Sequence, residues 1–370
     1  MRNLRAGSLS KKGGKQSAIG GTVRRDAGAV PALVLAFLLL SGFTACAHRG
    51  TPEGSRAAAP PASRCAAPVE TVVSLIAGNL ETDLSHLSAS IRSLGSEFAD
   101  QYEKTPFIAP EEERQWLARA KTEKKTTGFL LQDEGKEPAY QADLPAYLVY
   151  RDGHFDPGVW RELKAFLALA PSFRLAFETF DYSWVYLATA RETMMIYPYL
   201  PLSEATNNYP LTAQVFYTAA DYANRTFGWT EPYLDLVGAG MMVTVSWPIF
   251  LDNELLGVAS RDITLNQLAA RTLAPVGGSK AGLTAFIVNR NGMVIANSDP
   301  AAMKEVNEAN EQAKAAVLHY RTVAPPGSAA VLSSFDLYNR ACEEVLTLAR
   351  ENRNDEFLHG IVQSGGAAHR

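Results

Sequence analysis

Residues 209–262 read YPLTAQVFYTAADYANRTFGWTEPYLDLVGAGMMVTVSWPIFLDNELLGVASRD, in a chain of 370 residues. A tyrosine-rich segment that we expect to be helical leads into the turn WTEPYLD. Two apolar runs with strand-forming residues follow at Met242–Ile249 and Leu255–Ser260, joined by the polar turn 251–254. A lone acid, Asp262, comes just after the second run. The stretch therefore predicts a helix, a turn and a pair of strands that ends on a carboxylate.

A long helix is expected upstream of this stretch. Its apolar residues recur at alternating spacings of four and three, which is a heptad pattern. The pattern leaves two arrangements open, because such a seam either packs along the chain's own sheet or pairs with a second copy in a homodimer. The seam residues are Leu80, Leu84, Leu87, Ile91, Leu94 and Phe98.

The remaining periodicities predict an α+β architecture, with a long helix, an antiparallel sheet with helices and a second, smaller sheet. A hydrophobic fraction of 47% with 20% charged residues supplies ample material for a core. Pro171 is expected to interrupt the helical pattern around it. Further strands are predicted at 184–190, 194–199, 284–288 and 293–296, and further helices at 110–121, 160–180, 301–319 and 335–350.

The N-terminal segment has the pattern of a bacterial lipoprotein signal peptide. An apolar run at 30–40 follows several basic residues and is too short to span a bilayer. The sequence SGFTAC at 41–46 is similar to a lipobox, so we expect residues 1–45 to be removed and Cys46 to carry lipid. Ala47 after the cysteine favours the outer membrane, facing the periplasm. Residues 46–67 are rich in Ala, Pro, Gly and Ser and predict a flexible tether.

Removal of residues 1–45 takes away seven basic residues and one acidic residue, leaving 28 basic against 38 acidic residues and a net charge of −10. Such a chain is a poor binder of nucleic acid, because phosphate binding needs a basic face. It suits cationic ligands better. Two further cysteines, Cys65 and Cys342, form either one disulfide or two free thiols, and the sequence leaves both open.

Within the first stretch, the tyrosines, the turn Pro232–Asp235 and Asp262 resemble the amino-acid-binding branch of the double Cache (dCACHE, PAS-like) sensor family. That family's signature is a tyrosine, an Arg-x-Trp-Tyr run, a tyrosine in a Pro-Tyr-x-Asp turn and a final aspartate. The resemblance covers about residues 68–300 and implies extracytoplasmic ligand recognition. It divides the chain into a signal peptide (1–45), a tether (46–67), a long helix with a ligand-binding subdomain (68–275), a smaller subdomain (276–350) and a tail (351–370).

The resemblance also implies a ligand site. Tyr209 matches the first tyrosine, and Gln214-Val215-Phe216-Tyr217 falls where Arg-x-Trp-Tyr is expected. The half that holds an ammonium in the family is intact, whereas the half that holds a carboxylate is altered. We therefore expect a ligand site made of Tyr209, Gln214, Phe216, Tyr217, Trp229, Tyr233 and Asp262.

The replacement of arginine by Gln214 has a chemical consequence. A neutral amide cannot reproduce the two charge-assisted bonds of a guanidinium to a carboxylate. An ammonium would still find a countercharge at Asp262 and aromatic faces at Tyr217, Tyr233 and Trp229. The pattern thus favours an amine without a carboxylate.

Several of these residues have simpler structural explanations. Tyr217 and Phe216 also suit core positions, and Asp235 suits closure of the Pro232 turn. Thr264 and Gln267 form a predicted capping box, which leaves Asp262 without a capping role. On a regular helix the side chains at 214 and 216 point about 200° apart, so a shared pocket requires a break in the helix.

An enzymatic role finds no support in the motifs. Neither a nucleophile elbow nor a phosphate-binding glycine loop is recognised, and the six histidines are not paired at metal-ligand spacing. We expect no cofactor and no metal. With no kinase or chemoreceptor signalling module recognised after the Cache-like region, relay to an envelope partner is expected. The alternative is a structural or partner-binding lipoprotein whose pocket binds nothing.

Overall fold

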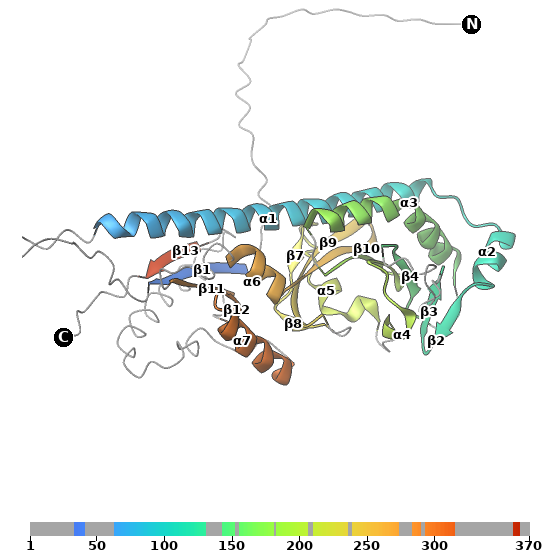
Figure 1. Cartoon of the computed structure of the whole chain (residues 1–370). Coiled ribbons are helices and arrows are strands. Elements are labelled where there is room, and N and C mark those ends of the chain that lie inside the picture. The colour runs from blue at the N-terminus through green and yellow to red at the C-terminus, as the bar shows by residue number, and fades with distance from the viewer. Residues whose placement is uncertain are drawn as a thin grey trace, which may run out of the picture.

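Two sheets lie one after the other beneath a single long helix, α1 (Ser63–Lys104), in the computed structural model (Figure 1). This arrangement of helices and largely antiparallel sheets confirms the predicted α+β class. The structure describes residues 33–40, 63–130, 143–151, 155–180, 183–205, 210–235, 239–273, 283–289, 293–314 and 358–362.

The heptad seam of α1 is buried within the chain itself. Its six residues, from Leu80 to Phe98, are between 0 and 4% exposed and belong to the core that includes α3 (Pro157–Phe180). The intramolecular alternative is therefore the correct one. The apolar side chains of the seam already pack inside one copy, so a homodimer through the helix around Leu80–Phe98 would use another face of α1, and it stays a prediction.

The larger sheet is antiparallel throughout, and its centre is the hairpin of β9 (Met241–Leu251) and β10 (Glu254–Thr264). Both strands are longer than the sequence predicted, so Asp262 lies inside β10 instead of following it. The order across the sheet is β2 (Lys121–Glu123), β3 (Thr126–Phe129), β4 (Ala146–Val149), β6 (Thr193–Tyr197), β5 (Trp184–Thr189), β10, β9 and β7 (Gly228–Trp229), with β8 (Tyr233–Leu234) also paired to β9.

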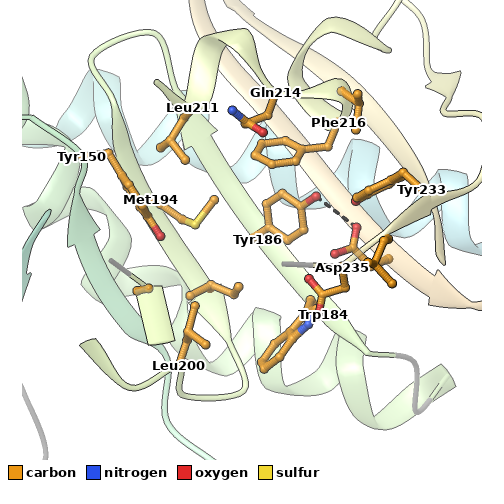
Figure 2. Close-up of a pocket in the computed structure, with 15 residues that line it drawn as sticks. Tyr150, Trp184, Tyr186, Met194, Leu200, Leu211, Gln214, Phe216, Tyr233 and Asp235 are labelled. Carbon is orange, nitrogen blue, oxygen red and sulfur yellow. Dashed lines mark hydrogen bonds between the residues drawn. The ribbon is translucent and has the colours of Figure 1, made fainter. Parts of the chain in front are cut away.

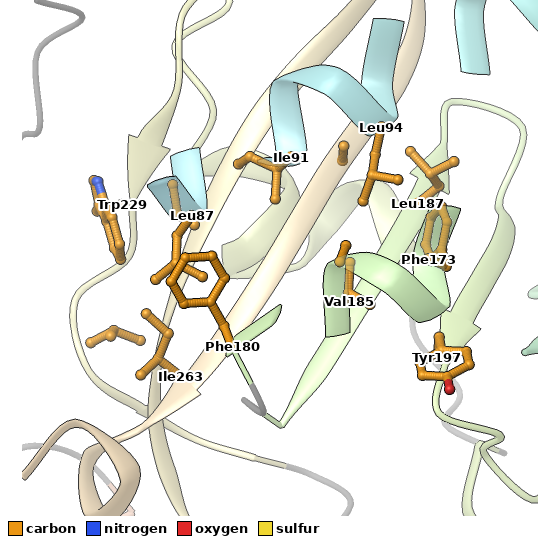
Figure 3. Close-up of a cluster of buried hydrophobic side chains, with 14 of the residues drawn as sticks. Leu87, Ile91, Leu94, Phe173, Phe180, Val185, Leu187, Tyr197, Trp229 and Ile263 are labelled. Atoms are coloured by element: carbon orange, nitrogen blue, oxygen red, sulfur yellow. The ribbon is translucent and has the colours of Figure 1, made fainter. Parts of the chain in front are cut away.

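The two faces of this sheet have different roles. Val185 and Leu187 of β5 point to the face covered by α1 and α3, where they join a large apolar core (Figure 3). Tyr186 and Ala188 point to the other face, where a second cluster of buried residues lies. This alternation follows from the two-residue period of a strand. The second face is covered by short segments: α4 (Leu202–Ala205), η1 (Leu211–Ala213) and α5 (Val215–Thr218).

Buried Arg261 connects the sheet to α3. This residue of β10 is fully buried on the helix-covered face, and its guanidinium donates to the carbonyl oxygens of Ala176 (2.6 Å) and Phe177 (3.3 Å). These carbonyls belong to the last turn of α3, where the backbone has unpaired acceptors and a cation is favourable. The helix runs without interruption through Pro171, so the predicted break there is wrong.

The smaller sheet has the order β12 (Val294–Asn297), β11 (Leu283–Asn289), β1 (Leu33–Leu40) and β13 (Leu358–Val362). β1 runs parallel to β13, and the other pairs are antiparallel. The β1 residues are those assigned to the signal peptide, and that assignment stays a prediction. α6 (Leu265–Leu273) connects the two sheets, and α7 (Pro300–Ala313) follows β12.

Direct bonds also link the two parts of the molecule. The Asn289 amide donates to the carboxylate of Glu231 over 2.6 Å, and the Arg271 guanidinium pairs with Asp83 of α1 over 2.7 Å. Cys46, Cys342 and the helix predicted at 335–350 lie outside the described residues, while Cys65 lies in α1. Among the described helices, none has the length and apolarity needed to cross a membrane.

Because the α1 seam lies in the core, we expect alanine substitutions at two leucines of α1 to differ in how much stability they remove. Leu87→Ala should lower the free energy of unfolding by about 2–5 kcal/mol, because Leu87 is fully buried and its removal leaves a cavity. Leu75→Ala is the matched control on the same helix, at a side chain that is 57% exposed. Urea unfolding followed by circular dichroism measures both. Equal losses in the two variants would contradict the assignment of the seam to the core.

Candidate functional site

The polypeptide breaks at Gln214. The expected tyrosine-rich helix is instead two short pieces, η1 and α5, and Gln214 between them has an extended backbone (φ −79°, ψ 153°). The prediction of a regular helix here is wrong. A pocket shared by the side chains at 214 and 216 required a break in the helix. The observed break allows Gln214 and Phe216 to line one cavity.

That cavity lies on the second face of the larger sheet and has a volume of about 220 Å³ (Figure 2). Most of its wall is apolar or aromatic, and two carboxylates, of Asp235 and Asp262, line it as well. Among the lining residues that the structure describes, none is Lys, Arg or His. Its aromatic residues are Tyr150, Trp184, Tyr186, Phe216 and Tyr233.

Asp262 is held by a short chain of hydroxyl groups. It lies on β10 opposite Trp184 of β5 and Thr244 of β9, and it is 4% exposed. Its Oδ1 accepts hydrogen bonds from the Tyr186 hydroxyl (3.0 Å) and the Thr244 hydroxyl (2.6 Å). Because Thr244 donates its single proton to Asp262, the Tyr233 hydroxyl, 2.6 Å away, must donate to Thr244.

Burial raises the pKa of Asp262 to about 7, against the opposing effect of the hydrogen bonds from Thr244 and Tyr186. The negative charge of Asp235 contributes a further, smaller increase. Burial also raises the pKa of both Tyr186 and Tyr233 well above the ordinary value, so these phenols remain neutral donors. The carboxylate therefore has neutral donors around it, and a bound cation would stabilise its ionised form.

Asp235 has two roles, one in bonding the backbone and one in the cavity wall. Its Oδ2 accepts from the backbone N–H of Ala239 (2.8 Å), a bond to the backbone that follows Asp235 and not to the Pro232 turn named in the prediction. The residue also lines the cavity, which the sequence did not predict. The capping box is confirmed: the Gln267 N–H donates to the Thr264 hydroxyl, and the Thr264 N–H donates to the Gln267 side chain. Asp262 is thus free of a capping role.

The structure brings four of the seven predicted site residues together at the cavity: Gln214, Phe216, Tyr233 and Asp262. Tyr217 and Trp229 do not line it. Tyr217 is buried beside Tyr222, and Trp229 packs in the core on the opposite face of the sheet, near Ile263 (Figure 3). Tyr209 lies outside the described residues.

Sequence reasoning missed Tyr186, Trp184, Tyr150 and Thr244 as residues in or behind the cavity wall. A signal for two of them exists, because Trp184 and Tyr186 alternate along a strand and so share a face. Thr244 is found only from the pairing of β9 with β10. No group of three or more potential metal ligands occurs among the described residues.

The segment that carries the central strands of the larger sheet and most of the cavity wall matches a known protein family. Residues 162–270 match the first PDC sensor domain of methyl-accepting chemotaxis protein-like receptors. The matched range contains most of α3, the strands from β5 to β10 and most of the cavity wall. This segment is homologous to a class of domains that bind ligands for chemoreceptors.

Two curated chemoreceptors share sequence with this chain. The methyl-accepting chemotaxis protein McpC of Bacillus subtilis (strain 168) is 35% identical over 89 residues, which are 24% of this chain and 13% of that protein. The methyl-accepting chemotaxis protein PscA of Pseudomonas syringae pv. tomato is 29% identical over 111 residues, 30% of this chain and 17% of that protein. The similarity therefore spans less than a fifth of either relative.

Among solved structures, the ligand-binding domain of the Pseudomonas aeruginosa PAO1 amino acid chemoreceptor PctC, in complex with GABA, is 17% identical. The alignment covers 70% of this chain and 85% of that one, with a TM-score of 0.40. The ligand-binding domain of the Pseudomonas fluorescens chemoreceptor CtaA, in complex with L-serine, is 18% identical. Here the coverage is 67% and 79%, with a TM-score of 0.37.

The raised pKa of Asp262 predicts how stability depends on pH. A pKa raised from 3.8 to about 7 stabilises the folded state at low pH, and this contribution is lost as the pH rises through 7. Asp262→Asn mimics the protonated form, so at about pH 8 it should increase the free energy of unfolding by about 4 kcal/mol. Near pH 4 the variant and the parent should be equally stable.

Thermal unfolding of both proteins over this pH range makes the measurement. Burial also raises the pKa of Glu162 to about 7, but Glu162 is present in both proteins. The difference between the two curves therefore reports Asp262 alone. A variant that is no more stable than the parent at the higher pH would contradict the raised pKa.

Proposed function

We propose that this protein captures a small amine-bearing molecule in the cavity of its larger sheet, as a sensory ligand-binding protein. The supporting observation is the charge of the cavity wall. Two carboxylates line it, and none of the described lining residues carries a positive charge. A ligand with an ammonium group gains a countercharge there, whereas a ligand carboxylate would be buried without one.

The aromatic lining suits the same ligand. The Tyr186 and Phe216 rings stand edge to face with centroids 5.0 Å apart, and Tyr233 approaches Asp262 through Thr244. Aromatic faces attract a desolvated ammonium by about 1–2 kcal/mol each. In this proposal Asp262 neutralises the ammonium, Tyr233 and Tyr186 surround it, and Gln214 and Phe216 contact the rest of the ligand.

The cellular setting is part of the proposal. The family match of residues 162–270 supports an extracytoplasmic sensor, and the lipobox-like sequence at Cys46 supports a lipid anchor in the outer membrane. Relay of the ligand, or of the signal it produces, to an envelope partner follows from the sensory role. A disulfide between Cys65 and Cys342 remains part of this proposal for an oxidising compartment.

One observation favours the second candidate, a structural or partner-binding lipoprotein with a non-binding cavity. The Gln214 side chain donates one of its two amide hydrogens to the backbone oxygen of Pro210 (3.1 Å), so part of its donor capacity is engaged within the wall. Less of this side chain is then available to contact a ligand. The two candidates differ in whether any amine binds.

Thermal unfolding with a panel of amines and amino acids distinguishes the two candidates. An amine at about one hundred times its Kd should add about 2.7 kcal/mol and raise Tm by roughly 5–10 °C. The shift should vanish in Asp262→Ala, which lacks the countercharge, and persist in Asp252→Ala, a change at the exposed β9–β10 turn. No shift with any amine would favour the non-binding lipoprotein, and shifts with amino acids alone would contradict our interpretation of Gln214.

Amine affinity should also depend on pH through Asp262. With a pKa of about 7, the carboxylate is mostly protonated below neutral pH and cannot pair with an ammonium. Between about pH 8 and pH 5.5 we expect Kd to rise roughly thirtyfold, since each pH unit below the pKa costs a factor of ten. Isothermal titration calorimetry at both pH values makes this measurement. An affinity that does not change with pH would rule out Asp262 as the countercharge.

A further inference from the structure

A second acid supports the cavity wall without facing the ligand. Glu192 lies in the turn between β5 and β6, where its backbone adopts φ +63°, a conformation rare for residues other than glycine. Its carbonyl oxygen accepts from the Tyr150 N–H (2.8 Å), which fixes the turn against the end of β4. Its carboxylate extends to the short segments that close the cavity.

Those segments depend on Glu192 for their hydrogen bonds. The carboxylate accepts from the backbone N–H of Leu211, from the Thr212 hydroxyl (2.6 Å) and from the Thr212 N–H (3.4 Å). Leu211 and Thr212 open η1, whose first N–H groups have no partner inside the helix. The Glu192 carboxylate thus accepts hydrogen bonds from the start of the segment that continues into Gln214 and Phe216.

The segment needs such an anchor because its helices are short. η1 has three residues and α5 has four, and isolated helices of this length are unstable in water. Val215 is 48% exposed, so apolar burial holds this part of the wall only in part. Leu211 is buried, and it is the residue whose N–H bonds to Glu192.

The turn that carries Glu192 is itself attached on the other side of the sheet. The guanidinium of the neighbouring Arg191 pairs with buried Glu162 of α3 (3.2 Å) and contacts Glu254 (3.4 Å) and Asp156 (3.8 Å). A Cβ on Gly158 would lie 2.5 Å from Arg191 Nε, so the guanidinium is closely packed. The turn is therefore a rigid support for the cavity wall.

We propose that Glu192 is a positioning residue for the binding site: it sets the place of the wall formed by residues 211–216, and with it the affinity for ligands large enough to touch that wall. This inference rests on the proposed amine-binding function. A small amine held at Asp262 contacts mainly the tyrosine hydroxyl chain. An amine with an aromatic group must also pack on Phe216, Leu211 and Val215.

The test compares Glu192→Ala and Glu192→Gln with Glu204→Ala in the full chain. Glu204 is an exposed glutamate of α4 whose carboxylate makes no hydrogen bond or ion pair in the described part of the structure. Calorimetry with phenethylamine and propylamine gives the affinities. Glu192→Ala should weaken phenethylamine binding roughly tenfold and propylamine binding less than about twofold. Glu192→Gln should lie in between, because an amide oxygen still accepts from Leu211 and Thr212.

Hydrogen exchange without ligand gives a second readout. Glu192→Ala should speed exchange in residues 211–218 and leave β9 and β10 unchanged. If Glu192→Ala does not fold, Thr212→Val removes the 2.6 Å bond alone and should act in the same direction. An equal loss of affinity for both amines, or unchanged exchange in residues 211–218, would overturn the proposal.

The same experiment separates this inference from the function on which it rests. If the parent protein binds neither amine, the proposed function fails and the effect on affinity fails with it. Exchange in residues 211–218 then still reports whether Glu192 holds the wall. If the parent binds both amines but the Glu192 variants bind them as the parent does, only the positioning role is overturned.

Discussion

Two neighbouring charges in β10 are buried on opposite faces of the sheet, and the fold and the site both depend on them. Arg261 points to the helices and bonds to the last carbonyls of α3, while Asp262 points to the cavity. A shift of one residue in the register of β10 would exchange the two. The carboxylate would then face an apolar core, and the guanidinium would enter the cavity. The pairing of β10 with β5 and β9 is therefore strongly specified.

The same alternation explains why one sheet can hold both a core and a binding cavity. The helix-covered face is filled by long apolar side chains from α1, α3 and the strands. The other face carries a row of polar groups, among them Thr244, Ser246, Ser260 and Asp262, under short covering segments. Apolar packing is thus concentrated on one face of the sheet, and buried polar groups are concentrated on the other.

Much of this architecture was predictable from local patterns. The spacing of Leu80 to Phe98 predicted the long helix, alternation predicted the central strands, and Thr264 with Gln267 predicted the start of α6. The burial of the α1 seam within the chain was open, because a heptad pattern is the same for a partner helix and for a sheet. The strand β1 was not predicted, since an apolar run after basic residues reads as a signal peptide.

The candidate site was predictable only in part, for a physical reason. Phe216, Tyr233 and Asp262 lie in one stretch of sequence, and a resemblance within that stretch found them. Tyr186 and Thr244 reach Asp262 from other strands, and such pairings depend on register and not on spacing along the chain. The segment just before the break at Gln214 is bonded to Glu192, which precedes Gln214 by more than twenty residues.

The hydrogen bond between Asn289 and Glu231 connects the smaller sheet to the segment that leads into the cavity wall. Glu231 is two residues from Tyr233, whose hydroxyl belongs to the chain that ends on Asp262, and Pro232 between them restricts the backbone. Asn289 also accepts the Met293 N–H and so holds the turn between β11 and β12. The wall of the cavity and the end of β11 in the smaller sheet are therefore linked by a short peptide segment and one hydrogen bond. A displacement of Tyr233 would act on the end of β11 through this link.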